Sequence, residues 1–141
     1  MKYVCDAPDG KVWFRIETEG EAHLESRAMS HAVEKYFLQA QDKASESHRP
    51  VSDVYFEQNI GLAAHLKRTM PLFLTLRDGE GTALATAMLP PLGKPDPSFR
   101  IIIVGPGNRD PYRDHAAAIE ALARHYGMPL ERARCYPYAR S

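Results

Sequence analysis

The sequence has only two cysteines and opens without an apolar leader, and both features bear on the cellular compartment that we expect. Cys5 and Cys135 lie at opposite ends of the chain and form no Cys-x-x-Cys unit. A bridge between them would require export, and the sequence opens without an apolar signal segment. We therefore expect reduced thiols in a cytoplasmic protein.

The sequence also lacks an excess of either charge and any long hydrophobic run. Eighteen basic side chains balance eighteen acidic ones, which removes the net positive charge on which nonspecific nucleic-acid binding depends. The longest apolar runs are a few residues, far below the roughly 20 residues of a membrane-spanning helix. We expect neither nucleic acid nor a membrane as a partner.

What the chain does have is the composition of one globular domain. It has 141 residues, of which 44% are hydrophobic and 26% are charged. A chain of this length buries about two-thirds of its unfolded surface on folding, so stability requires neither a metal nor a disulfide. There is no internal repeat and no low-complexity tract. We expect a single domain over residues 1–141.

The N-terminal part predicts two strands and a long helix. Residues 2–5 and 11–17 are strand-like runs, and Asp9-Gly10 between them provides turn chemistry. Residues 18–21 (Thr-Glu-Gly-Glu) fit a capping box, in which side chains satisfy the free backbone N–H groups of a helix start. An apolar stripe at helical spacing then predicts one helix to about residue 45. The stripe consists of Ala22, Ala28, Met29, Ala32, Val33, Tyr36, Phe37 and Ala40.

The middle of the chain is less regular. Residues 45–52 are a connector, and residues 53–60 fit either a strand or a helix. We favour a helix for roughly 60–69, ended by Pro71.

The following residues predict three strands. Residues 71–78 and 82–89 form a hairpin around the Asp-Gly-Glu-Gly sequence at 78–81. A proline-rich loop then leads to a third strand over residues 99–104.

A last helix begins at Asp110-Pro111, with Asp110 as N-cap and proline at the first helical position, and Gly127 and Pro129 end it. The elements therefore run strand, strand, one or two helices, three strands, helix. This order predicts an α+β fold with a mostly antiparallel sheet of about five strands and helices packed on it. It resembles PAS-like and profilin-like sensor domains in element order only, without a shared motif.

The strand patterns predict a sheet that is apolar on both faces. One face carries Leu72, Leu74, Leu76, Ala83, Ala85, Ala87, Phe99, Ile101 and Ile103. The second carries Phe73, Thr75, Leu84, Met88, Ile102 and Val104, to which we add Trp13. An antiparallel sheet covered on one side is normally polar on the other. Helices, the C-terminal segment, a ligand or another subunit could each cover the second face.

The segment from Arg100 to His115 is the best candidate for a ligand site, because an apolar strand leads through a glycine turn into a helix start. Glycines allow close approach to the backbone, and a helix N-terminus attracts anions. Arginines can add bidentate contacts. The predicted contacts for a small anion are Gly105, Gly107, Asn108, Arg109 and Arg113. A dinucleotide fingerprint would need a third glycine where Asp110 stands, and the N-cap aspartate would itself occupy part of the anion position.

Two titratable side chains project onto apolar helix stripes. His115 falls inside the stripe of the last helix, near its positive end, where a neutral imidazole could act as a general base. Glu25 falls on the stripe of the first helix, where burial would raise its pKa. Each has a plainer interpretation, a core histidine bonded to a carbonyl and a stripe that fades near the helix start. The sequence does not tell whether the two meet.

The other histidines give no sign of a metal site. None pairs with another at i, i+4, there is no His-Glu-x-x-His pattern, and His31 projects onto the polar face of the first helix. We expect no metal and no cofactor.

Taken together, these features predict a small binding or regulatory domain. It would self-associate as a homodimer, or bind a protein partner, through an apolar sheet face. The alternative is a small-molecule sensor for an anion, or an enzyme, with its site at the Gly105–Gly107 loop and His115.

Overall fold

The computed structural model describes residues 1–48, 55–92 and 96–138 and has the predicted α+β architecture. The strands are β1 (Lys2–Ala7), β2 (Lys11–Arg15), β3 (Leu72–Arg77), β4 (Ala83–Leu89) and β5 (Ile102–Val104). The helices are α1 (Glu19–Met29), α2 (Val33–Glu46), α3 (Tyr55–Thr69) and α4 (Tyr112–Tyr126), with short 3-10 turns η1 (Pro106–Asn108) and η2 (Arg132–Arg134).

The five strands form one antiparallel sheet in which the spatial order follows the chain, β1-β2-β3-β4-β5. Tight turns join β1 to β2 and β3 to β4, as predicted: Asp9 and Gly10 have positive φ, and the Asp78 carboxylate accepts the backbone N–H groups of Glu80 and Thr82. The three helices α1–α3 are inserted between β2 and β3, which are neighbours at the centre of the sheet.

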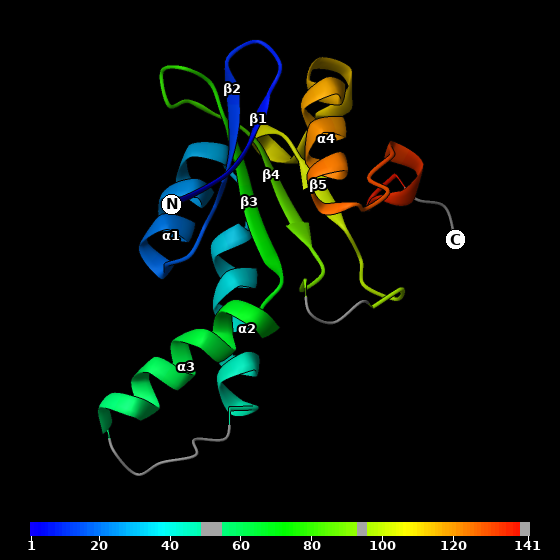
Figure 1. The fold of residues 1–141 in the computed structure, drawn as a ribbon. Helices are drawn as coiled ribbons and strands as arrows, with labels where there is room; N and C mark the ends of the chain where they lie inside the picture. Colours follow the sequence, from blue (N-terminus) through cyan, green and yellow to red (C-terminus); the bar gives the residue numbers. More distant parts are fainter. Residues whose placement is uncertain (49–54, 93–95, 139–141) are drawn as a thin grey trace.

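Helices cover both faces of the sheet, so the molecule has three layers (Figure 1). On one face α4 and the C-terminal segment pack against Trp13 and the leucines of β3. On the other face α1, α2 and α3 pack around Phe73 of β3, whose ring meets Phe37 of α2 edge-on at 5.2 Å. The apolar second face is thus covered largely from within the chain.

The prediction of one long helix up to about residue 45 is wrong, because the helix breaks at residues 30–32. Ser30 adopts the left-handed conformation (φ 53°, ψ 51°) and its N–H bonds back to the Ser26 carbonyl, which closes α1. The Ser26 hydroxyl accepts the N–H of Glu34 in the first turn of α2, so one serine serves both helix ends. Directly after the break, His31 contacts Thr86 of β4, as described below.

The prediction that Trp13 lies on the second face is also wrong. Trp13 pairs with Leu76 in the β2–β3 ladder and lies on the α4 face, where its indole N–H donates to the Ala118 carbonyl at 2.8 Å. Leu84 packs against the same core, because a bulge shifts the register between Leu76 and Arg77 and turns the start of β4 over. Beyond the bulge, Ala85 and Ala87 face the α4 core and Met88 faces the opposite core, as predicted.

The remaining element bounds differ in detail. Residues 55–60 are helical and belong to α3, while residues 53–54 lie outside the described residues. The third predicted strand is shorter, Ile102–Val104, and α4 ends at the left-handed Gly127 as expected. In the parts of the chain that the structure describes, every helix is too short or too polar to cross a membrane.

Candidate functional site

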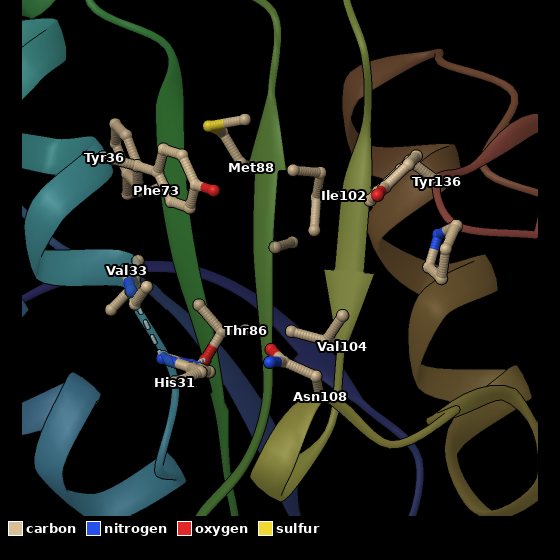
Figure 2. A pocket seen from close by; sticks show the side chains of 13 residues that line it. His31, Val33, Tyr36, Phe73, Thr86, Met88, Ile102, Val104, Asn108 and Tyr136 are labelled. Atoms are coloured by element: carbon tan, nitrogen blue, oxygen red, sulfur yellow. Dashed lines mark hydrogen bonds between the residues drawn. The ribbon is translucent and has the colours of Figure 1, made fainter.

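A pocket of about 380 Å³ opens on the second face of the sheet, over β4 and β5 (Figure 2). We call it the β4–β5 pocket. It is lined by His31, Ala32, Val33, Tyr36, Phe73, Thr86, Ala87, Met88, Ile102, Val104, Asn108, Tyr136 and Pro137. Its volume lies within the range of small-molecule sites.

The pocket exists because α2 covers β3 but stops short of the β5 edge. Tyr36 of α2 forms one wall, and the C-terminal segment forms the opposite wall. That segment is fixed to the sheet: the Tyr136 N–H donates to the Ile101 carbonyl at 2.8 Å, and the Arg100 guanidinium lies 4.7 Å from the centre of the Tyr136 ring. The strip of sheet between the walls stays open to a ligand or a partner.

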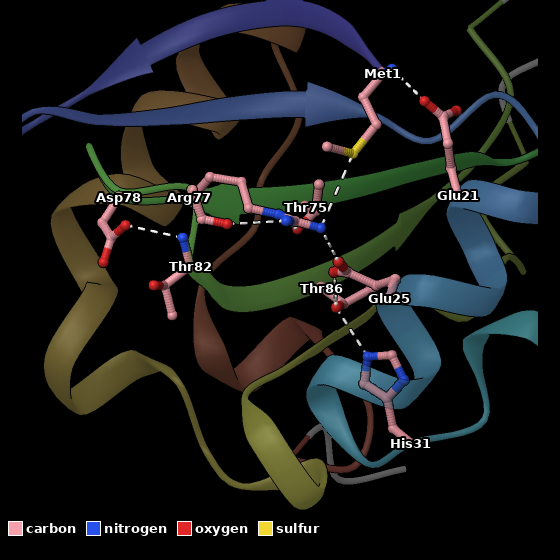
Figure 3. A network of polar contacts seen from close by, with 10 residues as sticks. Met1, Glu21, Glu25, His31, Thr75, Arg77, Asp78, Thr82 and Thr86 are labelled. Carbon is pink, nitrogen blue, oxygen red and sulfur yellow. Dashed lines mark hydrogen bonds and ion pairs between the residues drawn. The ribbon is translucent and has the colours of Figure 1, made fainter.

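A buried polar network closes one end of the pocket (Figure 3). The Glu25 carboxylate on α1 has no exposed surface and accepts two hydrogen bonds, from Arg77 at 2.7 Å and from the Thr86 hydroxyl at 2.5 Å. His31, in the break between α1 and α2, lies with its Nε2 2.8 Å from the same hydroxyl. The network thus runs from Arg77 at the end of β3 to the His31 ring in the pocket wall.

The donors in this network fix the protonation of His31. The Thr86 hydroxyl has one hydrogen and donates it to Glu25, so His31 must donate from Nε2. Its Nδ1 then accepts from the Val33 N–H, which lies 3.4 Å away. Burial lowers the pKa of His31, an effect that the Glu25 carboxylate partly offsets. The ring is therefore neutral at pH 7 and presents Nδ1, held by one long bond, as an acceptor.

Beyond this polar end the pocket is apolar and uncharged. Phe73, Met88, Ile102 and Val104 form its floor, and the described residues that line it include no Lys, Arg, Asp or Glu. Asn108 supplies a second polar group: its side-chain amide is directed towards Thr86 and makes no hydrogen bond to the described part of the chain. The pocket therefore offers an apolar body and one uncharged polar end.

The structure separates the predicted anion site into two parts. Asn108 reaches the β4–β5 pocket from η1, whereas Arg109 and Arg113 are exposed outside it. The N–H groups of Gly105, Asn108 and Arg109 are all bonded within the loop, to the carbonyls of residues 109, 105 and 106. Gly107 has the positive φ (63°) that the turn requires.

The start of α4 already holds an anion from the chain itself. The Asp110 carboxylate accepts the Tyr112 N–H at 2.9 Å and the Arg132 side chain at 2.6 Å. Binding of a small anion at this loop therefore remains a prediction. The geometry does not favour it, because the Asp110 carboxylate already occupies the helix start.

The two predicted catalytic candidates lie on opposite faces of the sheet. Glu25 belongs to the network on the α1 face and is completely buried. The plainer interpretation, in which the apolar stripe ends near the helix start and leaves Glu25 outside the core, is therefore wrong. His115 lies on α4, where Nδ1 is 3.2 Å from the Lys11 ammonium. Partial burial and the Lys11 charge lower the pKa of His115. Among the described residues, no chain of hydrogen bonds links Glu25 to His115.

Sequence reasoning missed His31 and Thr86. On a continuous helix His31 points to solvent, and only the break at Ser30 turns it towards β4. A signal for Thr86 was present: Thr75 and Thr86 are polar positions on an otherwise apolar face, and they are directly paired in the β3–β4 ladder. Buried hydroxyls need partners, so two threonines there indicate a polar network.

No protein-family model, curated protein or solved structure matches this chain. The resemblance in element order to PAS-like and profilin-like domains therefore gains no support from known proteins. Within the described residues, no group of three or more His, Cys, Asp or Glu side chains could hold a metal ion.

Proposed function

We propose that the protein is a binding domain for a small, uncharged and mostly apolar ligand in the β4–β5 pocket. The observation that carries this proposal is a fully buried carboxylate, Glu25, whose hydrogen bonds orient a neutral His31 at the end of an otherwise apolar cavity. Burying a charged group is unfavourable for stability unless it is well paired, and such groups gather at functional sites.

The two free cysteines support a reducing compartment, the cytoplasm, as the place where the protein acts.

The pocket lining indicates the kind of ligand. The free amide of Asn108 can donate to or accept from one polar group of the ligand, beside Thr86. The ligand body would lie on Met88 and Ile102, between the rings of Tyr36 and Tyr136. An anion is disfavoured because the described lining offers it no cation.

A thermal-shift screen of uncharged aromatic and alicyclic compounds that carry one hydroxyl or amide group tests the proposal. A ligand at 100 times its dissociation constant adds about 2.7 kcal/mol, or several degrees of melting temperature. Ile102→Trp fills the pocket floor and should abolish the shift. Leu24→Trp, on the exposed face of α1 (65% exposed), is the matched control and should keep it. No shift with any compound, or the same shift in Ile102→Trp, would refute the proposal.

Self-association through the same face is the second candidate, because the tyrosines of both pocket walls are unusually exposed. Tyr36 is 47% and Tyr136 46% exposed, and exposed aromatic side chains around an apolar strip are typical of protein interfaces. Light scattering should then give a dimer mass that Tyr136→Arg reduces. A monomer at high micromolar concentration would rule out a homodimer.

A further inference from the structure

A second pocket, of about 290 Å³, lies on the same side of the sheet but further along α2, between the end of β2, the middle of α2 and the last turns of α3. We call it the α2–α3 pocket. Its interior is apolar and is formed by Ile16, Phe37, Leu66 and Met70. Unlike the β4–β5 pocket, its rim carries charged side chains, among them Arg15 and Lys67.

Three cations converge at this rim. Lys2 and Arg15 face each other in the β1–β2 ladder. The Arg15 guanidinium donates to the Lys67 carbonyl at 3.1 Å, which holds it at the end of α3. Lys2, which is not part of the lining, lies close enough to Lys67 that its like charge lowers the pKa of Lys67.

Two carboxylates oppose these cations at the rim. Glu17 lines the same pocket and acts on Lys67 in the opposite direction to Lys2. Gln41, the other polar group of the lining, donates its amide to Glu19 at 2.8 Å. The lining holds two cations, Arg15 and Lys67, and one carboxylate, Glu17. With the neighbouring Lys2 and Glu19 the count is three cations against two carboxylates, which leaves one positive charge in excess beside an apolar cavity. An anion placed there would relieve the repulsion between the two ammonium groups.

We propose that the α2–α3 pocket binds an amphiphile with a carboxylate head and a short aliphatic tail. The head would lie between Arg15, Lys67 and Lys2, where arginine can hold a carboxylate through two parallel hydrogen bonds. The tail would enter between Phe37, Leu66 and Met70. The pocket is at the lower end of the size range of small-molecule sites, so the tail is short. This site does not depend on the function proposed for the β4–β5 pocket.

Calorimetric titration of the full chain with octanoate tests the proposal, with acetate and octan-1-ol as probes of head and tail alone. Octanoate should bind saturably. Each buried methylene should tighten binding about four-fold, so acetate should show no saturable binding, and octan-1-ol should bind at least about five-fold more weakly than octanoate. Affinity for octanoate should fall as salt rises.

Three variants place the site. Lys67→Gln and Arg15→Gln should each weaken octanoate binding at least about five-fold, whereas Arg68→Gln, an exposed cation one residue further along α3 and outside the pocket lining, should stay within about two-fold. Lys67 is exposed, so its variant tests the site even if Arg15→Gln fails to fold. Ile102→Trp, which fills the other pocket, should bind octanoate as the wild type does.

Several results would overturn the proposal. These are the absence of saturable octanoate binding, equal affinity for octan-1-ol, wild-type affinity in Lys67→Gln, or loss of binding in Ile102→Trp. Equal affinity for acetate and octanoate would show a site for small anions without a tail pocket, and would also refute it.

Discussion

Replacing Arg77 with methionine removes the cation that faces the Glu25 carboxylate and leaves that carboxylate buried without an opposite charge. Glu25 has no exposed surface, whereas the Arg77 side chain is 18% exposed. Losing one partner of a buried ion pair typically destabilises a protein by about 3–5 kcal/mol, and we expect Arg77→Met to fall in that range. Glu25→Gln should be milder, about 1–3 kcal/mol, because the unpaired arginine can turn towards water.

The difference between the two variants is the informative quantity. For a domain of this size, 1 kcal/mol corresponds to roughly 3–5 °C in melting temperature. Arg77→Met should therefore melt roughly 9–25 °C below the wild type, and Glu25→Gln roughly 3–15 °C below it. The double variant should lose about 2 kcal/mol less unfolding free energy than the two single variants lose together, because it leaves no unpaired charge.

Urea denaturation followed by the fluorescence of the single tryptophan, Trp13, measures these free energies. A surface pair on α4 provides the control: Arg124 and Glu120 are 3.6 Å apart and about 70% exposed. Arg124→Met should change the free energy of unfolding by less than about 0.5 kcal/mol. Equal losses in Arg77→Met and Glu25→Gln, or simple additivity in the double variant, would refute the buried-pair reasoning.

Three further predictions concern pH, a hydrogen bond and a helix end. Because burial lowers the pKa of His31, the unfolded chain takes up a proton first as pH falls from about 7 to 5, so stability falls over that window. His31→Gln should lose less stability than the wild type between about pH 7 and pH 5. The same slope of unfolding free energy against pH in both proteins would contradict this. Trp13→Phe removes the 2.8 Å bond to the Ala118 carbonyl and should destabilise by about 1–2 kcal/mol in thermal melts followed by circular dichroism, where an unchanged midpoint would argue against the bond. In Gly127→Ala the added methyl group meets open space, but alanine is forced into φ 65°, so the variant should be about 1 kcal/mol less stable than the wild type. Gly79→Ala has equal space and an ordinary φ, so its stability should be nearly unchanged. Equal melting temperatures for the two would reject the backbone explanation.

Local signals were enough to predict most elements of this fold. The turn at Asp9-Gly10, the hairpin turn at residues 78–81 and the stop at Gly127 depend on neighbouring residues alone, and the structure has them where the sequence places them. Period-two patterns likewise gave the two faces of β3, because no bulge interrupts residues 72–76.

The break at Ser30 and the position of Trp13 could not be found in this way. The left-handed Ser30 is followed at once by a residue with a partner distant in sequence, His31, whose Nε2 lies 2.8 Å from the Thr86 hydroxyl. The face of Trp13 depends on its register with β3, which follows in sequence only after three helices. Both are decided by tertiary contacts, which override local propensity.

The candidate site was predicted only in pieces. The helical stripe singled out Glu25 and the glycine loop singled out Asn108, but the sequence left open whether Glu25 lies near the loop and His115. The two are linked through Thr86, which the β4–β5 ladder brings beside η1 and whose hydroxyl donates to Glu25, and through the helix break that aims His31 at the same hydroxyl. Local sequence patterns do not show which distant segments of the chain pair with each other, and the site depends on that pairing.

The central pair of strands has a consequence for how the chain folds. β2 and β3 join residues roughly 60 positions apart, with α1–α3 closing the loop between them. By contrast, the β1–β2 and β3–β4 hairpins and the β4–β5 pair join nearby residues. We expect the two hairpins to form early and the β2–β3 seam to close late, so substitutions along that seam should mainly accelerate unfolding. The Glu25 network fixes α1 to β3 and β4 within the same late step, so the β4–β5 pocket would be among the last parts of the molecule to form.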